Sequence, residues 1–452
     1  MKMLSVEIQK LFGYADIDIP LKQSDDITLI HGPNGCGKTT ILELIRSVLK
    51  SDYARLKRIP FHSCAMKYDD GASLSIVKVE GPVIEESGRP PTRTILFKYF
   101  STDSSGKEST FEQKWSAMRE RALPTAWIER EIPELIRTGS SGWLNRLTGE
   151  TMSLDEVLEQ YSDQLPTQRQ VKQVPDWLEM RLSSADIHLI RSQRLLLSPH
   201  KRQYPDQDVR RAPIRETVDY YARELGRTVS EKLAESVNIA QSLDRTFPSR
   251  LLQTSTTGDV TEEALRQRYA AIEEKRQRLM GVGLIDDEGR VALPTQAMEE
   301  TERKVLALYL DDTEKKLNAF AEIERKLTTF CDILNGKMSK TKTVTIDRRK
   351  GFVFSPVHAP EQKLQPTQLS SGEQHQVVLF YELIFQASPG SIILIDEPEI
   401  SLHVDWQRQF LKDLGKVNSL SQHTFIIATH SPQIIHDRWD LTVPIQGGIV
   451  HE

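Results

Sequence analysis

One stretch near the N-terminus restricts the fold more than any other. Residues Gly32–Thr39 read Gly-Pro-Asn-Gly-Cys-Gly-Lys-Thr and fit the pattern G-x-x-x-x-G-K-[S/T] at every position. A short apolar strand is predicted before them at 26–31, and apolar residues at helical spacing predict a helix at 41–49. A strand, a glycine-rich turn and a helix in this order open an α/β fold.

The residue types in this loop point to phosphate chemistry. Glycines let successive backbone N–H groups turn inward around an anion at a helix N-terminus. The Lys38 ammonium then contacts the β- and γ-phosphate oxygens of a nucleotide, and the Thr39 hydroxyl binds Mg²⁺. The predicted nucleotide-binding residues here are Gly32, Asn34, Gly35, Cys36, Gly37, Lys38, Thr39 and Thr40.

A second motif lies far along the chain, at residues 391–398. It is a continuous apolar run that ends in Asp396 and Glu397, as expected of a strand buried on both faces of a parallel sheet. Ligands bind at the carboxyl ends of such strands. Asp396 is therefore predicted to hold Mg²⁺, and Glu397 to act as the base for an attacking water.

Two further elements carry polar residues at predicted element ends. Ser370 and Glu373 form the pattern of a capping box, which predicts a helix N-terminus able to bind an anion. The alternative is a capped core helix without a ligand. A second apolar strand, 425–429, runs directly into His430, which would lie at the same sheet edge and sense the γ-phosphate.

Composition excludes several classes of protein. The chain has 452 residues, a formal net charge of −5 and 38% hydrophobic residues, so it can bury a core and is not a polybasic nucleic-acid binder. No stretch approaches the length of a membrane span. Three cysteines provide no disulfide framework or metal-ligand spacing. We expect a cytoplasmic protein with reduced cysteines.

The remaining patterns predict a chain in three parts. Alternating residues predict hairpin strands at 72–79 and 94–100, and a broken helical pattern covers about 110–190. Helices are predicted at 214–245, 261–280 and 298–336, as separate elements of moderate length rather than a long coiled-coil arm. A hairpin follows at 343–354. The expected domains are an N-terminal lobe at 1–104, a helical insertion at 105–335 and a C-terminal lobe at 336–452.

Taken in order, the four motifs resemble the head of an ABC-type ATPase: Walker A, signature, Walker B and switch histidine. The wording of residues 369–376 and 396–403 is similar to the RecF/SMC/OLD-like branch rather than to transporter subunits, and His403 stands where transporters carry Asp. Within that branch the chain resembles the stand-alone ATPase subunits of PARIS-type and Septu-type antiphage systems. The resemblance covers about 1–50 and 365–445.

This resemblance implies an α/β P-loop NTPase: an ABC-ATPase head with a mixed β sheet and a large helical insertion. It implies ATP and Mg²⁺ as ligands, with Lys38, Glu397 and His430 as catalytic residues. Ser370 and Gly372 would contact the ATP of a second subunit, and Thr39, Asp396 and Gln193 would hold Mg²⁺. Gln193 could equally be a surface glutamine. Phe12 and Tyr14 are candidates for stacking on adenine.

Three functions share this chemistry. The first is an ATP-dependent sensor and scaffold of an antiphage complex, which dimerises around ATP and controls a separate effector nuclease, Toprim-like or HNH. The second is a repair or recombination ATPase that clamps DNA. The third is a transporter ATPase, which the signature, the insertion and His403 disfavour. Because 22 residues (452 − 430) follow His430 in this sequence, we expect the nuclease to be a separate polypeptide.

Overall fold

The computed structural model describes residues 2–84, 92–103, 106–115, 128, 132, 135–138, 142–145, 150–154, 157, 174–183, 186–192, 195–197, 215–253, 261–286, 292–338, 340–400 and 402–445. By its contacts the chain divides into two compact units. The first unit comprises residues 1–215 and 387–452, and the second comprises 216–386. The expected division into three parts, with limits near 104 and 335, stays a prediction.

A parallel sheet forms the centre of the first unit. Its five strands lie in the order β11-β16-β17-β3-β18, and every neighbouring pair is parallel. Because the strands run in one direction, their carboxyl ends share one edge. The phosphate loop, the acidic pair Asp396 and Glu397, and His430 therefore all lie at that edge. The strands are β3 (Ile27–His31), β11 (Ile187–Ile190), β16 (Ile392–Asp396), β17 (Thr424–Thr429) and β18 (Thr442–Pro444).

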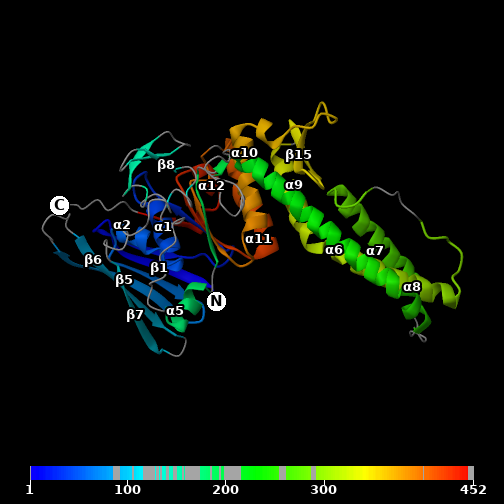
Figure 1. Cartoon of the computed structure of the whole chain (residues 1–452), viewed down its shortest axis with the longest axis horizontal. Coiled ribbons are helices and arrows are strands. Elements are labelled where there is room, and N and C mark those ends of the chain that lie inside the picture. Colours follow the sequence, from blue (N-terminus) through cyan, green and yellow to red (C-terminus); the bar gives the residue numbers. More distant parts are fainter. Residues whose placement is uncertain are drawn as a thin grey trace. The chain divides into compact units, whose positions relative to one another are not determined.

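An antiparallel sheet of six strands, in the order β2-β1-β4-β5-β6-β7, completes this unit (Figure 1). Helix α1 (Lys38–Leu49) packs between the two sheets, since its buried residues share one apolar cluster with both. The predicted hairpin at 72–100 is confirmed as β5 and β6. The elements are β1 (Met3–Leu11), β2 (Ala15–Pro20), α2 (Tyr53–Arg58), β4 (Ser63–Tyr68), β5 (Ser73–Ile84), β6 (Thr92–Thr102) and β7 (Glu108–Trp115).

Residues 108–153 differ from the helical pattern expected there. β7 pairs with β6, and β8 (Leu135–Thr138), β9 (Gly142–Asn145) and β10 (Thr151–Ser153) form a small antiparallel sheet. Its own apolar cluster includes the buried side chain of Trp143. The strands β8, β9 and β10 are only three or four residues long, so helical and strand periodicity cannot be told apart in them. Helix α5 (Asp176–Ser183) comes later in the chain. Two strands of two residues each follow, β12 (Leu196–Leu197) and β13 (Arg215–Glu216).

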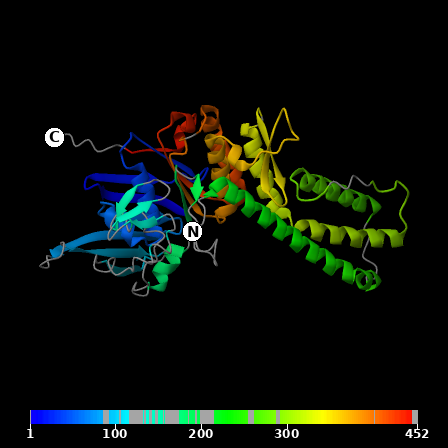
Figure 2. The ribbon, with the colours of Figure 1, turned by 45° about the horizontal axis from the view of Figure 1, so that its top comes forward.

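The second unit is mainly helical, as expected, but its helices differ in length. Helix α6 (Thr217–Gln253) has 37 residues and exceeds its predicted range. The single helix predicted at 298–336 is two helices, α8 (Glu300–Asn318) and α9 (Ala321–Met338), with a break at residues 319–320. Together with α7 (Glu262–Gly281), α6 and α8 form a helical arm, seen from two sides in Figure 1 and Figure 2.

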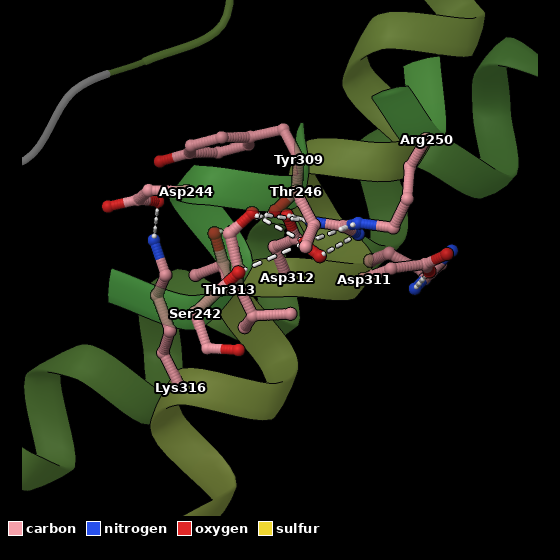
Figure 3. Close-up of polar contacts among 11 residues, drawn as sticks. Ser242, Asp244, Thr246, Arg250, Tyr309, Asp311, Asp312, Thr313 and Lys316 are labelled. Atoms are coloured by element: carbon pink, nitrogen blue, oxygen red, sulfur yellow. Dashed lines mark hydrogen bonds and ion pairs between the residues drawn. The ribbon is translucent and has the colours of Figure 1, made fainter. Parts of the chain in front are cut away.

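Charged contacts explain why α6 extends beyond its apolar pattern. The Arg250 guanidinium donates two hydrogen bonds, of 2.6 and 2.7 Å, to the carboxylate of Asp312 on α8, which is 4% exposed (Figure 3). One turn away, the Lys316 ammonium binds Asp244 at 2.8 Å. The bidentate pair of Arg250 and Asp312 fixes the geometry, and both contacts lie in the part of α6 that has no buried residue, after Val229. The expectation of helices of moderate length was therefore wrong for α6, whereas α8, with 19 residues, agrees with it.

A hairpin holds the base of this arm. β14 (Lys342–Asp347) and β15 (Gly351–Pro356) pair as predicted, and their turn packs on α6. A Cβ at Gly226 would lie 2.4 Å from the Arg349 carbonyl oxygen. A Cβ at Gly351, whose φ is +75°, would lie 1.8 Å from the Ala222 oxygen. The backbones of the hairpin turn and of α6 are thus too close together for a side chain to fit between them at these two glycines. The remaining elements of this unit are η3 (Pro366–Gln368), α10 (Ser371–Tyr381) and the π-helix η4 (Glu382–Gln386).

The variant Gly351→Ala should lower the free energy of unfolding by about 3 kcal/mol, because it adds left-handed backbone strain to a steric clash. Chemical denaturation measures this loss. Gly336→Ala is the matched control. It lies in α9 with no heavy atom within 4 Å of a new Cβ, so alanine there should be neutral or stabilising. Equal losses for both variants would contradict the close approach described here.

Candidate active site

The phosphate loop joins β3 to α1 and needs its glycines. Gly35 and Gly37 have φ of +82° and +95°, which only glycine adopts without strain. Gly37 is also the N-cap residue of α1, so the loop presents the free N–H groups of a helix start. Asn34 and Gly35 are exposed at the loop tip. The backbone at this position is thus suited to surround an anion.

The side chains of the loop converge on its centre. The Lys38 ammonium donates to the carbonyl oxygens of Gly32 and Pro33 at 2.9 and 3.0 Å, and Lys38 is 5% exposed. Cys36 is partly buried, and its sulfur would lie 3.0 Å from a Cβ at Gly32. Thr40 is partly buried in the first turn of α1. The positive charge of Lys38 is therefore held within the loop rather than extended into solvent.

One contact brings the two main motifs together. The Thr39 hydroxyl lies 3.0 and 2.9 Å from the two carboxylate oxygens of Asp396, across 357 positions of sequence. β3 and β16 flank β17 in the parallel sheet, so the loop after β3 and the end of β16 meet at one edge. The sequence placed both residues in one magnesium site, and the structure places their oxygens in hydrogen-bonding contact.

The surroundings of Asp396 favour a cation. Burial raises the pKa of this carboxyl above its usual range, and the nearby carboxylates of Glu397, Glu43 and Glu399 raise the pKa further, while the Thr39 hydroxyl lowers it. A hydroxyl and a carboxylate are hard oxygen ligands of the kind that Mg²⁺ binds, with phosphates and water completing the shell. The residues present therefore fit a magnesium ion held by Thr39 and Asp396. No group of three or more His, Cys, Asp or Glu among the described residues forms a protein-only metal site.

Glu397 follows in an unusual backbone conformation. Its φ is +45°, a left-handed value that costs a non-glycine residue free energy and that clusters at functional sites. Its N–H donates to the Ala428 carbonyl of β17 at 2.9 Å, which holds the turn. The carboxylate lies 3.9 Å from Nδ1 of His430. The predicted base and the predicted switch histidine are thus neighbours.

A third acid, Glu399, was not predicted as a site residue. It is 8% exposed, and its carboxylate oxygens lie near Thr429 and His430. The only sequence signal was a second glutamate two positions after Glu397, in the run Asp-Glu-Pro-Glu. Periodicity cannot show that a turn folds this side chain inward.

The predicted signature residues lie in the second unit. Ser370 and Glu373 form the expected capping box: the Ser370 N–H donates to Glu373 at 2.9 Å, and the Glu373 N–H donates to the Ser370 hydroxyl at 3.4 Å. Burial pushes the pKa of Glu373 up, but hydrogen bonds from Lys342 and Ser370 hold this pKa below its usual range. Gly372 is in the first turn of α10. Gln193 lies outside the described residues.

An aromatic side chain borders the phosphate loop. A Cβ at Gly37 would lie 2.6 Å from the ring of Phe12, so the ring rests against the start of α1. Phe12 is 36% exposed and Tyr14 is 53% exposed, with ring centroids 6.4 Å apart. Of the two aromatic candidates, the ring that borders the loop is that of Phe12.

A family model matches residues 153–436, more than half of the chain, under the description "AAA domain, putative AbiEii toxin, Type IV TA system". The chain belongs to this family. At the family level this AAA protein is an ATPase, and with the parallel sheet the match confirms the α/β P-loop NTPase fold. The matched residues include α10, β16 and β17 but begin after the phosphate loop.

More distant likenesses are of the ABC and SMC type. The spermidine/putrescine import ATP-binding protein PotA of Mycoplasma genitalium is 21% identical over 471 residues, which cover 96% of this chain and 72% of that protein. The Smc head domain of Pyrococcus furiosus, with an extended coiled coil and bound to the C-terminal domain of ScpA, aligns over 96% of this chain and 91% of its own, at 14% identity and a TM-score of 0.33. The SMC head domain of Thermotoga maritima aligns over 98% and 94%, at 11% identity and a TM-score of 0.31.

Removing the charge of Asp396 should stabilise the fold in the absence of ligand and weaken the binding of Mg²⁺ and ATP. In Mg²⁺-free buffer at neutral pH, Asp396→Asn should melt roughly 2 °C or more above the parent, because the folded state no longer holds a buried carboxylate among other acids. The sign follows from the raised pKa: ionisation costs more in the folded than in the unfolded state. The advantage should disappear at a pH below the ordinary range of Asp, where both states bind the proton.

Thermal melts with Mg²⁺ and ATP complete this test. The parent should gain stability from the bound nucleotide by mass action, and Asp396→Asn should gain much less. Asp405→Asn, an exposed carboxylate on α11 (Val404–Ser421), is the control and should behave as the parent in both buffers. A variant that melts lower without magnesium and keeps the full gain would contradict the assignment of Asp396.

Proposed function

We propose that this AAA protein binds and hydrolyses ATP with Mg²⁺ as the sensor and scaffold subunit of an antiphage defence complex, where it controls a separate effector nuclease. The contact between Thr39 and Asp396 carries the ATPase part of this proposal. It joins a phosphate loop to an acidic strand end, which is the minimum that metal-assisted phosphoryl transfer needs. Magnesium held there would neutralise charge on the phosphate oxygens.

The side chains of the first unit then take distinct roles. Lys38 contacts the β- and γ-phosphate oxygens from inside the loop, and Glu397 orients and deprotonates the attacking water. His430, which is 3.9 Å from Glu397, faces the γ-phosphate from the end of β17. Phe12 would stack on the adenine, since its ring borders the helix start that holds the phosphates.

The signature residues support a dimer around ATP. Ser370 caps α10, an 11-residue helix whose N-terminus favours an anion, and Gly372 in its first turn adds no side chain there. In proteins that the motifs resemble, this helix end meets the ATP of a second subunit. We therefore propose a homodimer with two nucleotides, each bound between Lys38 of one subunit and Ser370 of the other.

Mixing two inactive variants tests the ATPase and the dimer together. Lys38→Ala should lose nucleotide binding, and Ser370→Arg should obstruct the opposite site. Each homodimer has no intact site, whereas a mixed dimer has one intact and one doubly altered site. ATPase activity should therefore recover to about a quarter of the wild-type rate on mixing, if sites act independently and half of the dimers are mixed.

Native mass spectrometry of the mixture shows whether mixed dimers form. If they form and the mixture stays inactive, the arrangement in trans is wrong or hydrolysis needs both sites. A wild-type chain that fails to hydrolyse ATP would contradict the ATPase itself. Ser370→Arg with a normal rate on its own would remove Ser370 from the site.

The defence role has narrower support. The motifs at 369–376 and 396–403 resemble antiphage ATPase subunits, and the family description names a putative toxin and a TA system. The DNA-clamping alternative is equally consistent with the ATP chemistry. The transporter alternative, which the name of the Mycoplasma protein would favour, fits less well, because His403 caps α11 where transporter subunits carry Asp. Among the described residues, no helix has the length and apolar character needed to cross a membrane.

Two measurements separate the remaining alternatives. Under the defence proposal, the chain purified from its native host should retain a second polypeptide with nuclease activity, identified by intact mass. Under the alternative, the isolated chain should bind duplex DNA with an affinity that falls steeply as salt rises. Salt-dependent DNA binding by the isolated chain, with no polypeptide retained, would overturn the defence proposal.

A further inference from the structure

Glu399 is a buried carboxylate whose contacts differ from those of an ordinary structural acid. It lies in the turn after β16, is 8% exposed, and belongs to the first unit with all its partners. A buried charge is costly unless donors surround it. The donors come from the first residues after β17, and they include an imidazole.

Three contacts join Glu399 to the end of β17. The backbone N–H of His430 donates to Oε1 at 2.8 Å, and Nδ1 of the same histidine lies 3.0 Å from that oxygen. The Thr429 hydroxyl donates to Oε2 at 2.9 Å. Glu399 therefore holds both the backbone and the ring of His430, and each carboxylate oxygen has a partner.

The chemistry of these groups defines which ring nitrogen carries a hydrogen. An ionised carboxylate only accepts hydrogen bonds, and Oε1 lies 3.0 Å from Nδ1 of His430 as an ion-pair contact, so the carboxylate favours a hydrogen on Nδ1 over a lone pair there. The other nitrogen, Nε2, is then the one left to address a ligand. A histidine fixed in this way by a carboxylate has a set tautomer and a set ring plane.

Neighbouring hydrogen bonds agree with the Thr429 hydroxyl as a donor to Glu399. The Thr429 hydroxyl accepts from the Ser431 N–H at 3.0 Å, so its own hydrogen is free to point at Glu399. The Ser431 hydroxyl donates to Gln407 on α11 at 2.7 Å. Glutamine at position 399 could not reproduce this pattern, because its amide has one acceptor and would direct a second donor at either Thr429 or His430.

A purely structural role would need only part of this arrangement. The backbone N–H of His430 and the Thr429 hydroxyl would suffice to satisfy a buried carboxylate that links a turn to a strand. The imidazole is not needed for that purpose, because His430 has a side chain that is 42% exposed and could hydrogen-bond to water. The carboxylate instead orients an exposed ring beside Glu397, at the edge where Thr39 and Asp396 meet.

We propose that Glu399 is a positioning residue for ATP hydrolysis, which acts by holding His430 with its hydrogen on Nδ1 and its Nε2 toward the γ-phosphate. The proposal rests on the proposed ATPase function. It predicts that loss of the carboxylate lowers turnover without weakening nucleotide binding, since the hydrogen bonds and the ion pair of Glu399 described above all join it to the end of β17.

Steady-state kinetics of Glu399→Gln test this in two backgrounds. In the otherwise wild-type chain, kcat should fall about tenfold or more, as expected when the partner of a functional histidine is lost, and KM for ATP should stay within about twofold. In the His430→Ala chain, the same change should alter kcat by less than about twofold, because the group through which Glu399 acts is gone. Asp413→Asn, a buried carboxylate on α11, is the matched control and should leave kcat unchanged in both.

A spectroscopic readout keeps the test independent of activity. In ¹⁵N-histidine spectra, the His430 ring is the signal absent from His430→Ala. It should carry its hydrogen on Nδ1 in the wild-type chain and lose that preference in Glu399→Gln. If Glu399→Gln does not fold, Thr429→Val removes the bond to Oε2 and the bond that the Thr429 hydroxyl accepts from the Ser431 N–H, keeps the Glu399 carboxylate, and should give a smaller fall in kcat.

Each outcome decides between the proposals. Equal falls in kcat in both backgrounds would make Glu399 a structural residue and overturn the inference, as would an unchanged kcat or a wild-type ring with its hydrogen on Nε2. A wild-type chain without ATPase activity would instead overturn the proposed function. The ring spectrum would then still show whether Glu399 sets the tautomer.

Discussion

The hydrogen bond between Thr39 and Asp396 depends on the parallel direction of five strands. If one of β3 or β16 ran the other way, the loop and the acid would lie at opposite edges of the sheet. The antiparallel sheet and α1 share one apolar cluster with one face of the parallel sheet, and the polar groups of the site lie at the edge of that sheet. Burial and, after it, the acids collected there raise the pKa of Asp396, and a bound cation would lower that pKa. The interior of this unit is thus well packed, while the carboxylates at the sheet edge repel one another. Functional sites commonly lower the stability of the fold in this way.

Sequence reasoning succeeded where local pattern and chemistry coincide. The phosphate loop, the buried strands that end in Asp396 and His430, and the capping box at Ser370 were all predicted at the correct residues, because each needs a particular residue type at a fixed spacing. Which of these residues act in catalysis stays a prediction, since geometry places them without testing their roles. Gln193 lies outside the described residues.

The failures also have physical reasons. The strands β8, β9 and β10 are too short for periodicity to distinguish them from helix. The length of α6 depends on partners more than 60 positions away, such as Asp312, and no local pattern contains them. Glu399 was missed for the same reason: its inward orientation is set by a turn that places Glu397 in a left-handed conformation and by donors from another strand.

The ionic contacts in the helical arm restrict which insertions and deletions α6 and α8 can accommodate. Asp244 and Arg250, six residues apart on α6, contact Lys316 and Asp312, four residues apart on α8. An insertion of a single residue between the first two would turn one of them by about 100° around the helix axis and break its contact. In homologous proteins, insertions and deletions between these contacts should therefore comprise whole turns of helix. Changes of other lengths should lie outside this segment.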